Sequence, residues 1–268
     1  MKMPETALRF DDVHFAYENA SISVEVIRSL SFDVSSHEIF GLVGPSGCGK
    51  TTILKLAADL VTGSTSGSIV IDGTSPAQAR AERRIAILFQ RPILLPWRNV
   101  LENVLLPSQI ADDPPAPSKA KAMELLDLAG VADFSDRPIH ELSGGMQQRV
   151  SLVRSLMSEP RLLYLDEPFI SLDEVVKEDL LQLTQRVAQS LSLTVLHVSH
   201  SLEDSVLLCD RVAVLAPRPT TVSQLIDISL DRPRHYQQRI EPEFLEALSS
   251  VRNAVHANGR NALKGGLQ

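Results

Sequence analysis

Hydrophobic positions along this chain follow two periods, and each predicts a different kind of element. Short continuous apolar runs are typical of buried strands, and they occur at 39–43, 85–89, 162–165, 194–198 and 211–215. A further strand is predicted at 67–71. Apolar residues at helical spacing predict helices at 52–58, 100–110, 118–129, 143–157, 173–191 and 202–209. This succession of strands and helices predicts an α/β fold.

The two ends of the chain carry other patterns. Residues 8–34 alternate apolar and polar positions, as Val24 and Val26 do, which predicts antiparallel strands. Beyond Arg234 the pattern weakens, but apolar residues from Phe244 to Val255 keep helical spacing and predict a terminal amphipathic helix. We favour packing of this helix against the rest of the chain over a regulatory role, and we expect the chain to fray from Gly259.

A glycine-rich loop lies between the strand at 39–43 and the helix at 52–58. Its residues are Gly44, Pro45, Ser46, Gly47, Cys48, Gly49, Lys50 and Thr51, followed by Thr52. Glycines let backbone N–H groups turn toward phosphate oxygens, and the following helix directs its positive end at the same anion. Lys50 is suited to the outer phosphates and Thr51 to Mg²⁺. The alternative is a glycine-rich turn that arose by chance. The loop predicts binding of a nucleoside triphosphate.

An acidic pair ends the apolar run at 162–165. Open α/β sheets place ligands at the carboxyl ends of their strands, and Asp166 and Glu167 lie there. Asp166 is predicted to serve the metal, and Glu167 to act as the general base that deprotonates the attacking water. The alternative is that both are surface acids that end a strand.

A second glycine-bearing helix start lies at Ser143. Ser143 is a suitable N-cap, and Gly144 and Gly145 leave the first turn without side chains. Such a turn allows an anion to approach closely. The alternative is a capped helix that simply begins with glycines.

The order of these motifs resembles the nucleotide-binding subunit of ATP-binding-cassette (ABC) transporters. The motifs are the phosphate loop, Gln90, the segment 142–149, Asp166 with Glu167, the segment 171–173 and His200. The resemblance covers about residues 8–234. It implies a P-loop NTPase (RecA-like) core with an antiparallel β subdomain and a helical subdomain at about 91–158. The cassette would span 1–240, with a C-terminal helix and frayed tail at 241–268.

The resemblance also implies roles for single residues. Tyr17 would stack on adenine, although a tyrosine that merely ends a strand is the alternative. Gln90 would contact Mg²⁺ or water and report nucleotide state to a membrane partner. His200 would contact the γ-phosphate, and Asp173 would contact a second copy of the chain. ATP and Mg²⁺ are the implied cofactors.

Two cassettes are implied to form a head-to-tail homodimer. Ser143 and Gly145 of one copy would then close over the γ-phosphate that Lys50 of the other copy holds. A helix start without side chains is of little use to its own chain if the phosphate loop already covers that triphosphate. ATP would join the two copies, and hydrolysis would remove the difference in affinity between the closed and open pairs.

Composition narrows the partners. The formal net charge is −7 and the pI about 5.5, which argues against a nucleic-acid partner. Cys48 and Cys209 do not suggest a disulfide framework, and a cysteine in the phosphate loop suits a reducing compartment. No apolar run approaches the roughly 18 residues that span a bilayer, and residues 1–10 lack a signal-peptide core. We therefore expect the chain to reach the cytoplasmic face of the membrane through a permease subunit.

Four segments resemble the importer branch that serves nitrate, sulfonate, taurine and certain thiamine-precursor systems. They lie at 94–97, 101–104, 210–212 and 217–219. This branch implies an external solute-binding protein, although Trp97 is alternatively a packing anchor. A nucleic-acid- or ribosome-directed ABC ATPase and a non-hydrolysing nucleotide sensor remain as rival functions. The cargo itself is not predicted, because the cassette does not touch it.

Some positions depart from the family pattern. They are Asp59, where glycine is common, Arg91, where an acid is frequent, Ser171, where alanine is usual, and Ser201, where aspartate is typical. None of them removes a predicted phosphate or metal ligand. Arg91 and Ser201 leave open how tightly nucleotide state is coupled to the permease.

Overall fold

A six-stranded sheet forms the centre of the molecule. The computed structural model describes residues 5–18, 22–170 and 172–265, with side chains to residue 258. The strand order is β5-β6-β7-β3-β8-β9, parallel throughout except for β9, which pairs antiparallel with β8. The strands are β3 (Ile39–Val43), β5 (Ile85–Leu88), β6 (Leu162–Asp166), β7 (Thr194–Ser199), β8 (Arg211–Leu215) and β9 (Val222–Asp227). The predicted α/β class is confirmed.

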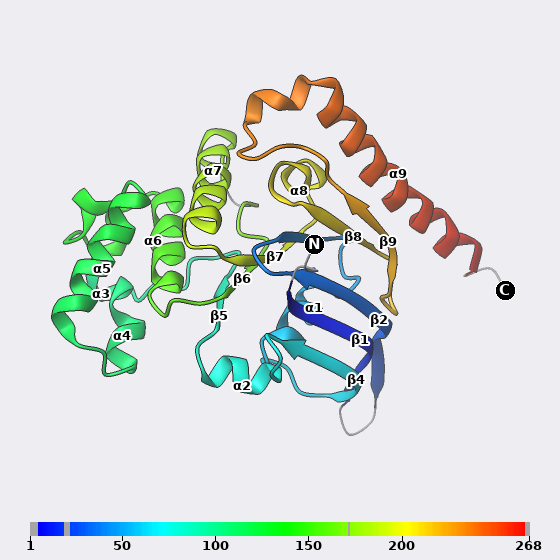
Figure 1. Ribbon diagram of the computed structural model, residues 1–268, viewed down its shortest axis with the longest axis horizontal. Helices are drawn as coiled ribbons and strands as arrows, with labels where there is room; N and C mark the ends of the chain where they lie inside the picture. Colours follow the sequence, from blue (N-terminus) through cyan, green and yellow to red (C-terminus); the bar gives the residue numbers. More distant parts are fainter. Residues whose placement is uncertain (1–4, 19–21, 171, 266–268) are drawn as a thin grey trace.

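A smaller antiparallel sheet lies beside the central one (Figure 1). Its strands are β1 (Thr6–Glu18), β2 (Ser23–Ser35) and β4 (Ser64–Ile71), in the order β2-β1-β4. Phe10 of β1 stacks on Phe32 of β2 with ring centroids 4.7 Å apart, and Phe32 stacks on Phe40 of β3 at 5.3 Å. This column of aromatic rings joins the two sheets.

Helices form a lobe beside β5 and cover the central sheet (Figure 1). The lobe holds α3 (Val100–Val104), α4 (Leu106–Ile110), α5 (Pro115–Leu128) and α6 (Gly144–Leu156). The other helices are α1 (Lys50–Ala57), α2 (Pro76–Ala81), α7 (Glu174–Ser190), α8 (Leu202–Leu208) and α9 (Pro242–Gly265). No helix in the described ranges is long and apolar enough to cross a membrane.

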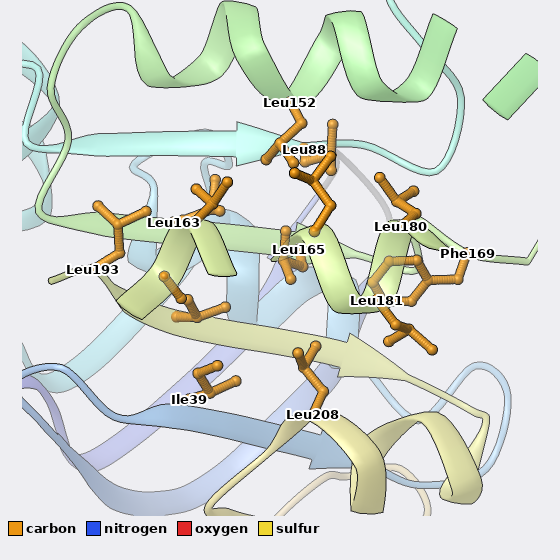
Figure 2. Close-up of a cluster of buried hydrophobic side chains, with 14 of the residues drawn as sticks. Ile39, Leu88, Leu152, Leu163, Leu165, Phe169, Leu180, Leu181, Leu193 and Leu208 are labelled. Carbon is orange, nitrogen blue, oxygen red and sulfur yellow. The ribbon is translucent and has the colours of Figure 1, made fainter. Parts of the chain in front are cut away.

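Both faces of the central sheet are buried, which explains why its strands read as continuous apolar runs. Leu163 and Leu165 of β6 lie in one apolar cluster, together with residues of α6, α7 and α8 (Figure 2). Leu162 and Tyr164 of the same strand lie in the second cluster, which includes Phe40 and residues of α1. Successive residues of β6 therefore serve opposite faces.

Three elements differ from the sequence predictions. The single helix predicted at 100–110 is two helices, because Pro107 has no N–H to continue the first and instead lies in the first turn of α4. The core strand predicted at 211–215 is confirmed as β8, but the edge strand β9 that follows it was not predicted, because its positions are largely polar and exposed. The short helix α2, capped by Ser75, was not predicted.

The C-terminal helix α9 packs on the body of the protein. Phe244, Leu248 and Val251 are buried in the same cluster as the core of α7 and α8. This agrees with the packing role that we favoured. Fraying from Gly259 and the predicted domain boundaries stay predictions.

Candidate functional site

The phosphate loop joins the carboxyl end of β3 to the start of α1, as predicted. Gly47 and Gly49 have φ of 75° and 122°, which side-chain-bearing residues rarely adopt. A Cβ on Gly49 would also lie 2.9 Å from Cγ1 of Val26. Lys50 is buried, and its Nζ donates to the carbonyl oxygens of Gly44 (2.8 Å) and Pro45 (3.1 Å). The ammonium group thus lies inside the loop.

A cavity of about 270 Å³ opens in front of this loop. Its walls are the phosphate loop, the first turn of α1, Glu167 and Arg218. Glu167 follows the carboxyl end of a different strand, β6. The parallel sheet therefore brings the two predicted motifs to one place.

The side chains of Asp166 and Thr51 are in contact with each other. The Thr51 hydroxyl donates to Oδ1 of Asp166 at 3.0 Å. Burial raises the pKa of Asp166 above its usual range, while this hydrogen bond acts in the opposite direction. Hydroxyl and carboxylate oxygens are ligands that suit Mg²⁺, so these residues fit the predicted metal.

Glu167 and His200 form a pair beside the cavity. Glu167 has a φ of 52°, and its N–H donates to the carbonyl of Val198 on β7 at 3.0 Å. Its Oε2 lies 3.0 Å from Nδ1 of His200. A sparsely populated backbone conformation of this kind is often found at functional sites. The carboxylate is therefore aimed by the neighbouring strand and by the histidine that follows it.

Tyr17 lies beside the start of α1. Its hydroxyl is 3.3 Å from Oγ1 of Thr52, and its ring makes an edge contact with Phe15 at 4.8 Å. Tyr17 as a whole residue is 39% exposed to solvent. An aromatic surface next to the phosphate loop is suited to stacking on a base.

The start of α6 lies outside the cavity. Ser143 caps the helix as predicted, because its hydroxyl accepts from the N–H of Met146 at 3.3 Å. A Cβ on Gly144 would meet nothing within 4 Å among the described residues, whereas one on Gly145 would lie 2.1 Å from Cγ1 of Val176 on α7. Asp173 caps α7 through the N–H of Val176 at 3.1 Å. Ser171 lies outside the described residues.

Gln90 is exposed at the end of β5 and does not line the cavity. The residue before it, Phe89, accepts a hydrogen bond from Nε2 of Gln148 on α6 at 2.9 Å. This contact ties the loop that carries Gln90 to the helix that begins at Ser143.

Comparison with known proteins places the chain in a family. Residues 27–170 match the ABC transporter family. The chain belongs to this family. It is therefore an ABC ATPase.

Curated relatives are similar to this chain over most of its length. The taurine import ATP-binding protein TauB of Jannaschia sp. is 36% identical over 217 residues, which are 81% of this chain and 80% of TauB. The uncharacterized ABC transporter ATP-binding protein MJ0412 of Methanocaldococcus jannaschii is 33% identical and covers 96% of this chain and 94% of its own. The nitrate import ATP-binding protein NrtC of Synechococcus elongatus is 33% identical over 87% of this chain but only 36% of NrtC.

A solved structure confirms the ABC cassette fold. The ATP-binding cassette MJ0796, described as a dimeric post-hydrolysis state bound to ADP and Pi, has a TM-score of 0.72. It is 23% identical and covers 84% of this chain and all of its own. The predicted P-loop core with a β subdomain and a helical subdomain is thereby shown.

Sequence reasoning missed two residues that contact the phosphate loop. Arg218 lines the cavity, and its guanidinium donates to the Gly47 carbonyl at 2.9 Å. Buried Thr220 donates from its hydroxyl to the carbonyl of Cys48. Both lie between β8 and β9. The sequence indicates the Pro217-Arg218-Pro219 segment there only as a mark of transporter type.

Proposed function

We propose that this chain is the ATP-hydrolysing subunit of an importer for a small solute of the taurine, sulfonate or nitrate kind. The observation that carries the proposal is an intact hydrolytic constellation in a chain that resembles import ATPases over most of its length. Relatives named for taurine and nitrate import support the direction and the class of solute.

Within one copy, the geometry supports the roles that we propose for single residues. The backbone N–H groups of the loop, which Pro45 lacks, and the ammonium of Lys50 bind the phosphates, and Tyr17 stacks on adenine. Thr51 and Asp166 would hold Mg²⁺, which supplies charge neutralisation at the phosphates when bound. Gln90, which does not line the cavity in one copy, is proposed as a further Mg²⁺ or water contact on the family resemblance alone. Glu167 deprotonates the attacking water, and His200 holds that carboxylate and faces the γ-phosphate.

A second copy completes the site. Ser143, Gly144, Gly145 and Asp173 do not line the cavity of their own chain, and Gly144 faces open space in the described structure. In a head-to-tail pair these residues approach the triphosphate held by the partner, and the bare helix start donates its N–H groups.

The permease would dock beside β5. A groove of about 180 Å³ runs between β5, α6 and the start of α4. Arg91 and Arg154 line it, and neither forms an ion pair with a described carboxylate. Trp97, 76% exposed, lies in the same loop region as Gln90. A permease loop with an acidic and an apolar face would fit this groove and would place the cassette on the cytoplasmic side of the membrane.

The experiment that tests the proposal captures the chain from membranes of its source and identifies the permease and solute-binding protein that accompany it. The purified solute-binding protein is then titrated with taurine, an alkanesulfonate, nitrate and a thiamine precursor by calorimetry. Binding of one of the first three supports the proposed solute class. Binding of the thiamine precursor alone would favour the alternative importer. Turnover stimulated by nucleic acid, with no permease present, would contradict transport.

A further inference from the structure

Two residues between β8 and β9, Arg218 and Thr220, hold the phosphate loop through its carbonyl groups. β8 pairs in parallel with β3, so the segment that follows β8 emerges beside the phosphate loop that follows β3. The Thr220 N–H donates to the carbonyl of Val26 at 2.7 Å, and the Arg28 N–H donates to the carbonyl of Thr220 at 2.9 Å. Because both bonds are made to β2, the segment at 216–221 is fixed on a sheet strand and is not a free loop.

Arg218 and Thr220 hold two consecutive carbonyl groups of the phosphate loop. Arg218 donates to the Gly47 carbonyl at 2.9 Å and Thr220 to the Cys48 carbonyl. In a planar trans peptide the N–H points away from the C=O. Holding these two carbonyls toward the β8–β9 segment therefore directs the N–H groups of Cys48 and Gly49 to the opposite side, into the loop. The Cys48 N–H does point inward, where it meets the Pro45 carbonyl at 3.2 Å.

Arg218 has a second property that Thr220 lacks. It is exposed, lines the same cavity as Lys50, and forms no ion pair with a described carboxylate. Its guanidinium therefore has further N–H donors at the edge of the cavity that Lys50 also lines. Guanidinium groups bind phosphate oxygens through two parallel hydrogen bonds.

We propose that the β8–β9 segment is part of the nucleotide site: Thr220 positions the phosphate loop, and Arg218 binds the phosphate chain of ATP as a second cation beside Lys50. The proposal rests on the proposed function, because it assigns these residues to the ATP site of that same ATPase. The site thus draws on a segment about 170 residues from the loop that it serves.

The test measures binding of ATP to the purified full chain by calorimetry, without permease. Arg218→Gln is expected to weaken ATP binding about tenfold, the loss typical of one charge-assisted hydrogen bond, and to leave AMP binding less affected. Arg218→Lys should recover part of the affinity. The difference between Arg218→Gln and the parent should shrink at high salt, because an exposed charge is screened. Arg252→Gln on α9 is the matched control, since Arg252 is also exposed but lies outside the cavity.

Thr220 is tested by a change of nearly equal volume. Thr220→Val removes the hydroxyl that holds the Cys48 carbonyl, and we expect ATP binding to weaken about fivefold. It should raise the KM for ATP while leaving kcat near that of the parent. Thr220→Ser keeps the donor and should restore the affinity, which a loss of packing alone would not predict.

Two results separate this inference from the proposed function. If Lys50→Ala abolishes ATP binding while Arg218→Gln and Thr220→Val bind ATP as the parent does, the inference is overturned and the ATPase assignment stands. If the parent chain itself neither binds nor hydrolyses ATP, the proposed function fails.

Discussion

The phosphate loop and the start of α6 are both glycine-bearing turns that lead into a helix, yet the chain holds them differently. The loop is enclosed by its own chain, with Gly49 against Val26 and with Lys50 bonded to two loop carbonyls. The start of α6 contacts α7 through Gly145 and presents Gly144 to open space among the described residues. The first is enclosed on its own chain, and in the function that we propose the second is half of a site that another copy completes.

The largest expected effect is the loss of turnover in Glu167→Gln. The substitution keeps the contact to His200 but removes the base, so turnover should fall about 10²- to 10⁴-fold. ATP binding should persist, because the enclosed loop is untouched, and ATP should then trap a dimer. Phosphate release and sedimentation in the presence of ATP measure the two effects. Steady-state hydrolysis at the parent rate would remove Glu167 from the role of base.

Mixing two inactive variants tests whether the open helix start serves the other copy. Lys50→Ala disables the loop and Ser143→Arg disables the helix start, so each should be inactive alone. In a head-to-tail pair, a mixed dimer keeps one intact site, and an equal mixture should recover up to about a quarter of the parent activity. Phosphate release from the mixture is compared with that from each variant. If the mixture stays inactive while both variants still dimerise, the two regions do not form a shared site.

The contact between α6 and α7 allows a finer test. Gly145→Ala places a Cβ against Cγ1 of Val176, and we expect it to lower the free energy of unfolding by about 1–3 kcal/mol. The double variant with Val176→Ala removes that methyl group and should recover most of this loss in urea denaturation. Its hydrolysis should nevertheless stay low if the bare helix start has to approach a phosphate. Full recovery of hydrolysis would reduce Gly145 to a packing residue.

The smallest effect at neutral pH is expected in the sheet beneath the phosphate loop. His197 of β7 is fully buried, both ring nitrogens lack a partner among the described residues, and burial lowers its pKa to about 3. Between pH 6.5 and pH 3 the unfolded chain therefore binds one more proton at this residue, and stability is lost as the pH falls, by up to about 1.4 kcal/mol per pH unit.

His197→Leu should remove this loss while keeping the contact with Phe169. Urea unfolding at several pH values should show the variant gaining on the parent as the pH drops below 6.5. A constant difference at all pH values would show that His197 does not titrate in this way.

Much of the site could be predicted because its motifs are local. The strand–loop–helix order fixes residues 44–51 as a phosphate loop, and the end of an apolar strand places Asp166 and Glu167 at the ligand-binding edge of the sheet. Ser143 was predicted as a cap for the same reason, since the cap and the N–H that it accepts are three residues apart. The family could be predicted too, because several motifs occur in one order.

The sequence by itself therefore determined the α/β class and the segments whose chemistry depends on near neighbours. These segments are the phosphate loop, the acidic pair and the helix caps. Only the tertiary structure decided which distant groups meet them. It placed His200 on Glu167, Val176 against Gly145, and Thr220 with Arg218 against the phosphate loop. The physical reason is that a hydrogen bond between groups far apart in the chain depends on strand order and register. No periodicity of apolar residues records either one.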